Sequence, residues 1–220
     1  MALAIFDLDN TLIGGDSDHL WGEYIIAQGL VDEKAYRRQN DEFYLAYQRA
    51  ELDIDAYLKF ALSPLPERSE AQWQRIHQGF LREAITPIML PKALQLLDKH
   101  RQQGDYLLII TATNGFITRP IAEALAVDHI LATDPELIDG QYTGGYLGTP
   151  CFAEGKVENL HHWLQDHPFD LHDSYFYSDS INDLPLLLEV GHPVVVNPDP
   201  ALEQTACDKQ WPILDLREPA

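Results

Sequence analysis

Short apolar runs recur along the chain, and each ends abruptly at a polar residue. Uninterrupted apolar runs of this length are typical of parallel strands that are buried on both faces. Stretches with helical periodicity lie between them, and strands alternating with helices predict an α/β fold with a Rossmann-like parallel sheet. The predicted strands are Ala2–Phe6, Tyr106–Ile110, Ser174–Tyr177 and Pro193–Val196, and the predicted helices are Pro91–Gln103, Ile117–Ala126, Lys156–Asp166 and Leu184–Glu189.

One interval breaks this alternation. From Ile13 to about Thr86 there is no strand pattern, and aromatic or aliphatic residues recur every three or four positions. We therefore predict an all-helical cap at residues 13–86, inserted after the first strand, with residues 1–12 and 87–220 forming the α/β core. A smaller interruption around Asp139-Gly140 predicts a β-hairpin between Glu136–Ile138 and Tyr142–Leu147.

The charge restricts the partners that we expect. The 220 residues include 15 Lys and Arg against 35 Asp and Glu, a formal net charge of −20. An acidic surface repels phosphate backbones and anionic lipids, so we expect neither nucleic-acid nor membrane binding. The two cysteines are too few for a disulfide framework, and no stretch reads as a signal peptide or membrane span, so we expect a cytoplasmic protein. The sequence leaves the oligomeric state open.

Polar residues with catalytic potential follow three of the predicted strands. Asp7 and Asp9 come after the first, Thr111 after the second, and Asp179 with Asp183 after the third. Parallel strands present their carboxyl ends at one edge of the sheet, so these side chains should converge. Each residue alone has an ordinary explanation as a helix cap or loop residue. Crowded carboxylates without clustered His or Cys favour a site for Mg²⁺.

These motifs resemble those of the haloacid dehalogenase superfamily of phosphatases across nearly the whole chain. Phe6–Leu12 is similar to the first motif of that family, Thr111 to the second, Lys156 to the third and Ser178–Asp183 to the fourth. The helical insertion resembles the C1 cap of the phosphoserine-phosphatase-like branch, subfamily IB. Within that branch the chain is similar to bacterial members regarded as histidinol-phosphate phosphatases.

The resemblance implies a role for each motif residue. Asp7 would be the nucleophile that forms an aspartyl-phosphate, and Asp9 the general acid and base. Mg²⁺ would be held by Asp7, the backbone carbonyl of Asp9, and Asp179. Thr111 and Lys156 would neutralise the phosphate oxygens. The remaining residues implied around the phosphate or the metal are Thr11, Ala112, Thr113, Asn182 and Asp183.

The cap suggests which phosphate ester is hydrolysed. Asp16 matches an acidic residue that binds the substrate amine in phosphoserine phosphatases. The arginine that binds the substrate carboxylate there has no counterpart, because Ala61 falls at its position, although Arg37, Arg38 or Arg49 could replace it from elsewhere. These features favour a small amino-alcohol phosphate, best histidinol phosphate. The expected substrate contacts are Asp16, Asp18, Trp21 and Glu23, with Tyr24 as a further aromatic candidate.

Several alternatives stay open at this point. Trp21 and Tyr24 could instead belong to the core of the cap. The substrate could be phosphoserine, or a phosphoethanolamine-like amine. The chain could also be a phosphomutase, or a binding module that uses the fold without turnover.

Overall fold

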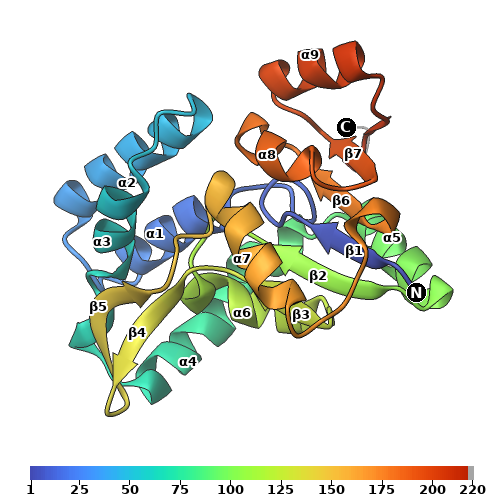
Figure 1. The fold of residues 1–220 in the computed structure, drawn as a ribbon. Coiled ribbons are helices and arrows are strands. Elements are labelled where there is room, and N and C mark those ends of the chain that lie inside the picture. Colours follow the sequence, from blue (N-terminus) through green and yellow to red (C-terminus); the bar gives the residue numbers. More distant parts are fainter. Residues whose placement is uncertain (218–220) are drawn as a thin grey trace.

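A six-stranded parallel sheet forms the centre of the computed structural model, which describes residues 1–217 (Figure 1). The strand order is β3-β2-β1-β6-β7-β8, and every neighbouring pair is parallel. A separate antiparallel hairpin is formed by β4 and β5. The predicted Rossmann-like α/β fold is confirmed. The strands are β1 (Leu3–Phe6), β2 (Tyr106–Ile110), β3 (His129–Leu131), β4 (Asp134–Ile138), β5 (Gln141–Leu147), β6 (Tyr175–Ser178), β7 (His192–Val196) and β8 (Ile213–Leu214).

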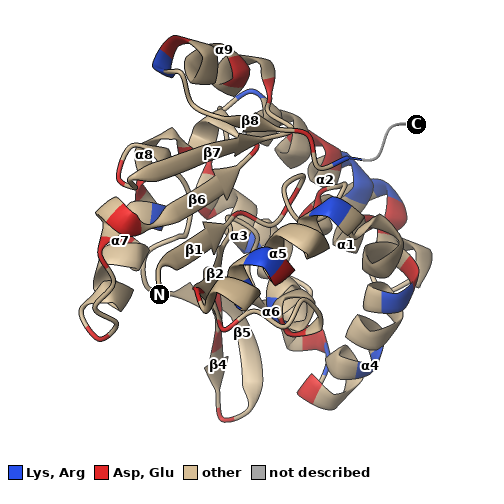
Figure 2. Ribbon diagram, turned by 90° about the vertical axis from the view of Figure 1, so that its right-hand side faces the viewer, with Lys and Arg blue, Asp and Glu red and all other residues tan. Residues whose placement is uncertain are grey.

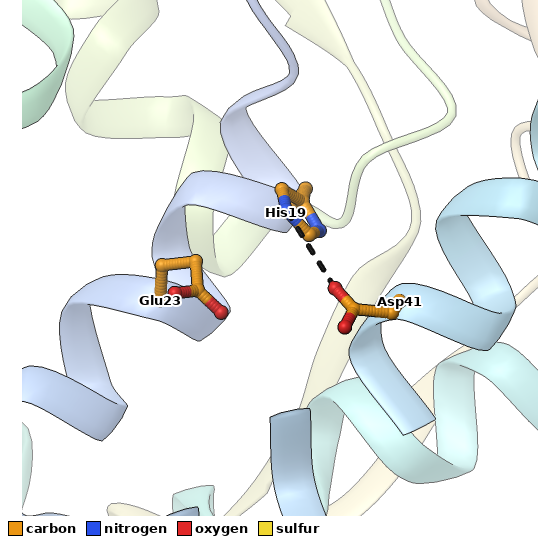
Figure 3. A group of neighbouring side chains, drawn as sticks. All are labelled: His19, Glu23 and Asp41. Carbon is orange, nitrogen blue, oxygen red and sulfur yellow. Dashed lines mark ion pairs between the residues drawn. The ribbon is translucent and has the colours of Figure 1, made fainter. Parts of the chain in front are cut away.

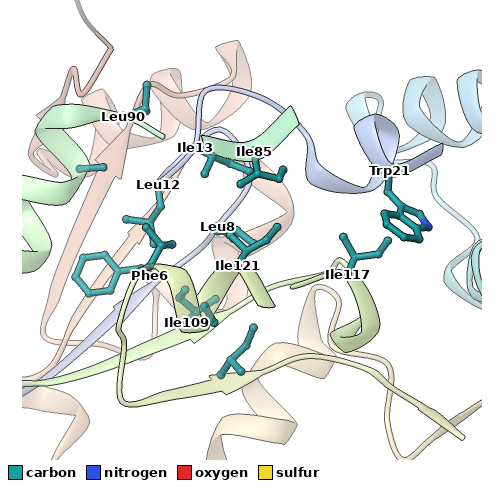
Figure 4. Close-up of a cluster of buried hydrophobic side chains, with 14 of the residues drawn as sticks. Phe6, Leu8, Leu12, Ile13, Trp21, Ile85, Leu90, Ile109, Ile117 and Ile121 are labelled. Atoms are coloured by element: carbon teal, nitrogen blue, oxygen red, sulfur yellow. The ribbon is translucent and has the colours of Figure 1, made fainter. Parts of the chain in front are cut away.

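Both faces of the sheet are covered by helices, as the apolar strands require. Alternate residues of β1 point to opposite sides: Phe6 packs in one hydrophobic cluster with residues of α5 and α6, and Ile5 in another with α7, α8 and α9. Figure 4 shows part of the first cluster, in which Phe6, Leu8 and Ile109 lie beside Ile121. These helices are α5 (Pro91–Gln103), α6 (Gly115–Ala124), α7 (Glu154–Leu164), α8 (Leu184–Leu187) and α9 (Pro200–Lys209).

Four α-helices occupy the interval between β1 and α5. Three of them begin after an Asp whose carboxylate accepts a hydrogen bond from the helix backbone, namely Asp16, Asp32 and Asp53. The connections to the core run side by side, with Gly14 N donating to Ile88 O at 2.7 Å. The helical character of this interval is confirmed, and its division from the core at residues 13 and 86 stays a prediction. The helices are α1 (Ser17–Ala27), α2 (Glu33–Gln48), α3 (Ile54–Leu62) and α4 (Glu70–Phe80).

The β4–β5 hairpin lies against the cap. Asp139 and Gly140 at its turn both have positive φ, 50° and 76°, as a two-residue hairpin turn requires. The Tyr146 hydroxyl of β5 is hydrogen-bonded to Asp55 of α3. The hairpin thus joins a segment far along the chain to the helices inserted after β1, as Figure 1 also shows.

Three elements were not predicted from the sequence. The strands β3 and β8 have three and two residues, too few for a period to be recognised. Helix α9 follows Asp199, which caps it by accepting from Ala201 N and Leu202 N. It buries only Leu202 and Ala206, so its apolar face is narrow and the pattern is weak.

Charged residues lie mainly on the helices and loops around the sheet. Figure 2 shows few charges on the strands themselves, whereas the helices carry most of the Asp, Glu, Lys and Arg. None of the helices within residues 1–217 has the length and apolarity that crossing a membrane requires.

A buried histidine in α4 makes stability depend on pH. His77 is 8% exposed, lies between the rings of Trp21 and Phe116, and has no hydrogen-bond partner for Nε2 among the described residues. Burial lowers the pKa of His77 from 6.5 to about 4. Below pH 6.5 the unfolded chain therefore binds a proton that the folded chain does not, so His77 weakens the fold as the pH falls towards 4.

We expect His77→Leu to remove this part of the pH dependence. Between pH 7 and pH 5 the wild-type protein should lose about 2 kcal/mol more of its unfolding free energy than the variant. At pH 5, which is about 1.5 units below the usual histidine pKa, His77 is protonated in the unfolded chain but not in the folded chain. Urea unfolding at the two pH values measures the difference. His162→Leu, on the exposed face of α7, is the matched control and should retain the wild-type dependence. Equal pH dependence in wild type and His77→Leu would contradict the prediction.

Candidate active site

The end of β1 places Asp7 beside a buried lysine. Lys156 Nζ donates to Asp7 Oδ1 at 2.8 Å and contacts both carboxylate oxygens of Asp183, at 2.7 and 2.9 Å. All three side chains are at most 5% exposed. Ser178 Oγ donates to Asp183 at 2.7 Å and so fixes the carboxylate that holds the lysine. Residues from three sequence motifs therefore converge, as predicted.

The charges in this cluster are not balanced. Burial raises the pKa of Asp7 to about 7, although the ammonium of Lys156 acts in the opposite direction. Burial also disfavours the charged lysine, but Asp183 and Asp7 outweigh it and hold the pKa of Lys156 above its usual value. The lysine is thus charged, and an added anion such as a phosphate finds a fixed positive group here.

Asp9 is held by both its oxygens. Ser17 N, in the first turn of α1, donates to Asp9 Oδ1 at 2.6 Å, and Thr113 Oγ1 donates to Asp9 Oδ2 at 2.8 Å. Burial raises the pKa of Asp9 to about 7, and the nearby charge of Asp16 adds to the effect. A carboxyl group with a pKa near neutrality can both give and accept a proton, which suits a general acid and base.

The loop after β2 supplies hydroxyl and amide groups next to these carboxylates. Thr111, which is 1% exposed, accepts a hydrogen bond from Thr113 N at 3.2 Å through its own Oγ1. Thr111, Ala112 and Thr113 all line the cavity that contains Asp7 and Asp9. Because its hydroxyl donates to Asp9, Thr113 positions that carboxylate in this structure rather than a phosphate.

A tight approach of two backbone segments positions Lys156. A Cβ on Gly155 would lie 2.0 Å from the carbonyl oxygen of Pro150, so only glycine fits there without moving the chain. Gly155 is the second residue of α7, and Lys156 follows it. The glycine before the lysine is therefore explained by the packing that brings Nζ to Asp7.

The carboxylates at the ends of β1 and β6 fit a hard divalent cation. Asp179 accepts from Thr11 Oγ1 at 3.5 Å, and its pKa is raised well above the usual value by burial and by the charges of Asp7 and Asp183. Asp7 and Asp183 contact the one lysine and Asp179 does not pair with it, so negative charge remains uncompensated. Oxygen donors alone, in a net negative buried cluster, suit Mg²⁺.

A cavity extends from the catalytic cluster into the cap. It is bounded by residues of both the core and the cap, so a ligand in it would contact the carboxylates of β1 and the cap together. Its wall combines the core residues with residues of α1, α2 and α3. The lining consists of Asp7, Asp9, Asp16, Asp18, His19, Phe43, Tyr44, Tyr47, Leu52, Tyr57, Thr111, Ala112 and Thr113.

Two acidic residues of the cap face this cavity. Asp16 and Asp18 stand at the start of α1, and neither forms an ion pair with a Lys, Arg or His of the described chain. Burial raises the pKa of each to about 7, and the Asp18 charge raises that of Asp16 further. These carboxylates lack the cationic partner that Asp7 and Asp183 have in Lys156.

Two of the expected substrate contacts do not line the cavity. Trp21 is 2% exposed and packs against Trp73, Phe80 and Phe116, and Figure 4 shows it pointing toward Ile117 of the core. This placement corrects the expectation for Trp21 and supports its alternative role as a core residue. Tyr24 packs beside it, 5.5 Å from Phe80 between ring centroids.

Glu23 does not line the cavity. Figure 3 shows it with His19 of the same helix and Asp41 of α2. Its carboxylate pairs with Arg37, so its charge is already compensated within the cap. This corrects the expectation that Glu23 contacts the substrate.

The loop after β6 contacts the cap through Asn182. Its Nδ2 donates to the backbone oxygen of Tyr47 in α2 at 3.4 Å. This amide joins the core to α2, and the expected role of Asn182 at the phosphate, the metal or Lys156 stays a prediction. Asp183, by contrast, lies where the sequence placed it, against Lys156.

Among residues 1–217 no arginine or lysine is exposed in the cavity wall, and Lys156 is buried against Asp7 at the core end. Arg37 is paired with Glu23, Arg38 lies near Glu42, and Arg49 is exposed at the end of α2. Ala61 is buried in a small cluster with Tyr57 and Leu58. None of the three arginines that could have replaced the missing carboxylate partner therefore does so in this structure.

Most of the cavity residues that the sequence did not single out are aromatic. Tyr57, Tyr44 and Phe43 belong to the periodic pattern of the cap, which does not distinguish a cavity wall from a helix interface. The amide of Ser17 gave no signal either, because any residue at that position offers the same N–H group.

A parallel sheet with buried carboxylates at its carboxyl edge, a buried lysine and a set of helices inserted after the first strand is the arrangement of a hydrolase of the haloacid dehalogenase type. The model of that family, haloacid dehalogenase-like hydrolase, matches residues 4–188. The chain belongs to this family.

Individual proteins of known sequence or structure are also similar to this chain. A protein of Neisseria meningitidis serogroup C named histidinol-phosphatase is 47% identical over 219 residues, covering 98% of this chain and 99% of its own. A crystal structure of a protein with unknown function from Bordetella pertussis has a TM-score of 0.91 at 42% identity, covering 98% of both chains. A substrate-bound phosphoserine phosphatase has a TM-score of 0.69 at 16% identity, covering 92% of this chain and 89% of its own, and shows the shared fold alone.

The expectation that the chain is an enzyme of the phosphatase class is confirmed by its family and by the similarity to the Neisseria protein. Phosphatases of this family generally depend on Mg²⁺ and act on small phosphate esters.

Proposed function

We propose that the protein hydrolyses a small amino-alcohol phosphate, histidinol phosphate, with Mg²⁺ and through an aspartyl-phosphate intermediate. The observation that carries the proposal is the composition of one cavity. At its core end lie Asp7, Asp9 and the loop of Thr111, and at its cap end lie two carboxylates without a cationic partner. A phosphate suits the first end and a protonated amine the second.

The first half of the reaction transfers the phosphoryl group to the protein. One carboxylate oxygen of Asp7 attacks phosphorus, and the bond from phosphorus to the ester oxygen breaks. Asp9, protonated at the start and held by Ser17 N and Thr113 Oγ1, gives its proton to the leaving alkoxide. Lys156 and the amides after Thr111 offset the negative charge on the phosphoryl oxygens.

The second half returns Asp7 to its starting state. Asp9, now ionised, takes a proton from a water molecule, and the resulting hydroxide attacks phosphorus of the aspartyl-phosphate. The bond between phosphorus and the Asp7 oxygen breaks, which releases inorganic phosphate and regenerates both carboxyl groups.

The residues that would hold Mg²⁺ are Asp7, Asp179 and the backbone carbonyl of Asp9. When bound, the ion supplies positive charge that offsets the phosphate and the crowded carboxylates. Asp183 and Ser178 keep Lys156 in place, and Thr11 keeps Asp179 in place.

The cap favours a substrate that has an amine and lacks a carboxylate. A carboxylate in the cavity would face Asp16 and Asp18 with no arginine or lysine in the wall to offset the repulsion. The name of the Neisseria relative supports the same substrate. Phosphoserine, which carries a carboxylate, is the competing substrate.

The experiment compares kcat/KM for release of inorganic phosphate from histidinol phosphate and from phosphoserine, with Mg²⁺ and after its removal by a chelator. We expect histidinol phosphate to be preferred at least about tenfold, because each uncompensated like-charge contact costs on the order of 1 kcal/mol or more. Activity should disappear with the chelator and return with Mg²⁺. A preference for phosphoserine would contradict the substrate, and transfer of the phosphoryl group to a second hydroxyl without phosphate release would indicate a phosphomutase.

A further inference from the structure

The cavity ends in an aromatic wall at its cap end. Phe43 and Tyr44 come from α2, Tyr57 from α3, and Leu52 from the loop between those helices. The rings of Phe43 and Tyr57 meet edge to face with centroids 5.9 Å apart, and Tyr44 is backed by a stack with His19 at 4.7 Å. Aromatic walls of this kind suit a flat ring.

The two cap carboxylates are bound differently by the protein. Asp16 Oδ1 accepts from His19 N at 2.8 Å, so this carboxylate also serves as the N-cap of α1. Asp18 accepts no backbone hydrogen bond within the described chain, and it lines the cavity together with Tyr57. The nearby hydroxyl of Tyr57 acts to lower the pKa of Asp18, against the larger effect of burial. The carboxylate of Asp18 is therefore available to a ligand.

Asp16 stands at the catalytic end of α1. Ser17, the next residue, donates its backbone N–H to Asp9 Oδ1 at 2.6 Å, which ties the start of this helix to the core. The charge of Asp18 raises the pKa of Tyr57 more than the charge of Asp16 does, which agrees with Asp18 lying closer to the aromatic wall.

We infer that Asp18 and Tyr57 form a second recognition point, which binds an N–H group of a flat ring in the leaving group and so selects ring-bearing amino-alcohol phosphates over ringless ones. The inference rests on the proposed function and assigns the amine itself to Asp16. The ring lies against Phe43 and Tyr44, and its N–H donates to Asp18.

Tyr57 makes this contact specific. Its hydroxyl is close to the Asp18 carboxylate in the cavity wall, so in the proposed complex it restricts that carboxylate and leaves a defined acceptor facing the ring. An amine without a ring reaches Asp16 but leaves Asp18 without a ligand and the aromatic wall uncovered. Such a substrate gains nothing from the second recognition point.

The test measures kcat/KM of wild type, Asp18→Asn and Tyr57→Phe with two substrates, histidinol phosphate and phosphoethanolamine, which has the amine but no ring. A hydrogen bond to a charged group contributes about 1.5–3 kcal/mol, so Asp18→Asn should lower the value for histidinol phosphate about 10- to 100-fold. The value for phosphoethanolamine should change less than about threefold. Tyr57→Phe should lower only the first value, by about 3- to 10-fold. Glu42→Gln, which removes an exposed charge from α2 outside the cavity, should change neither.

Two results would overturn the inference while leaving the proposed function intact. One is an equal loss for both substrates in Asp18→Asn, which would make Asp18 a partner of the amine or of the fold. The other is no loss for either substrate in both variants. If wild type itself failed to hydrolyse histidinol phosphate, the proposed function would fail together with the inference. Thermal unfolding of each variant shows whether it is folded, and Tyr57→Phe decides the test if Asp18→Asn is not.

Discussion

Asp7→Asn is expected to lower kcat for phosphate release by at least about 10⁴-fold, because it removes the oxygen that we propose attacks phosphorus. The amide has nearly the same shape as the carboxylate, so the cavity should persist. Lys156 keeps its two contacts with Asp183, so its charge stays paired after the substitution. The loss should therefore appear in kcat, with the folded state preserved.

Steady-state phosphate release measures the loss in kcat, and mass spectrometry of the protein during turnover detects the phosphorylated intermediate. The wild-type protein should carry a phosphoryl group that Asp7→Asn does not. Asp98→Asn, on the exposed face of α5, makes the same chemical change outside the site and should behave as wild type. Activity of Asp7→Asn within tenfold of wild type would rule out the proposed nucleophile.

The core of this site could be predicted from the sequence because the fold gives its residues a common location. Parallel strands end at one edge of the sheet, so polar residues directly after apolar runs must lie close together. Asp7 after β1 and Asp183 after β6 illustrate this, because both contact the same lysine although 176 positions separate them in the chain.

The cap could be predicted as helical but not in its detail. Trp21 and Tyr57 are both aromatic residues on amphipathic helices, yet Trp21 packs into the core and Tyr57 lines the cavity. Which face of a helix meets the cavity depends on how α1, α2 and α3 pack together, and periodicity alone does not specify this. The contact between Asn182 and Tyr47 could not be predicted for a related reason, because Tyr47 belongs to a separate helix packed against the loop of Asn182.

The same difference explains why the substrate is harder to predict than the reaction. The reaction depends on groups fixed by the ends of strands, which share backbone hydrogen bonds such as Asp7 N to Tyr177 O at 2.9 Å. Recognition of the substrate depends on side chains of separate cap helices. Rotating one of these helices partway about its axis would replace an aromatic cavity wall with a polar one. The role that we infer for Asp18 depends on Tyr57, which lines the same cavity but lies on a different helix.

Lys156→Met should be the most destabilising single change in the site. It would leave Asp7 and Asp183 buried against each other without their cation, and removing one partner of a buried ion pair costs about 3–5 kcal/mol. Methionine fills most of the same volume, so the loss would reflect charge rather than a cavity. Chemical denaturation measures it, and Lys99→Met, an exposed position on α5, is the matched control that should cost less than about 0.5 kcal/mol.

A second substitution separates the electrostatic cause from packing. In Lys156→Met combined with Asp183→Asn, one of the two unpaired carboxylates is removed, so part of the lost stability should return even though both residues of the pair are now changed. Activity should not return, because no positive side chain would remain at the phosphate end of the cavity. The double variant could instead be less stable than Lys156→Met by the full cost of Asp183→Asn alone. The two residues would then contribute independently to the free energy of unfolding, and their ion pair would not be the source of the lost stability.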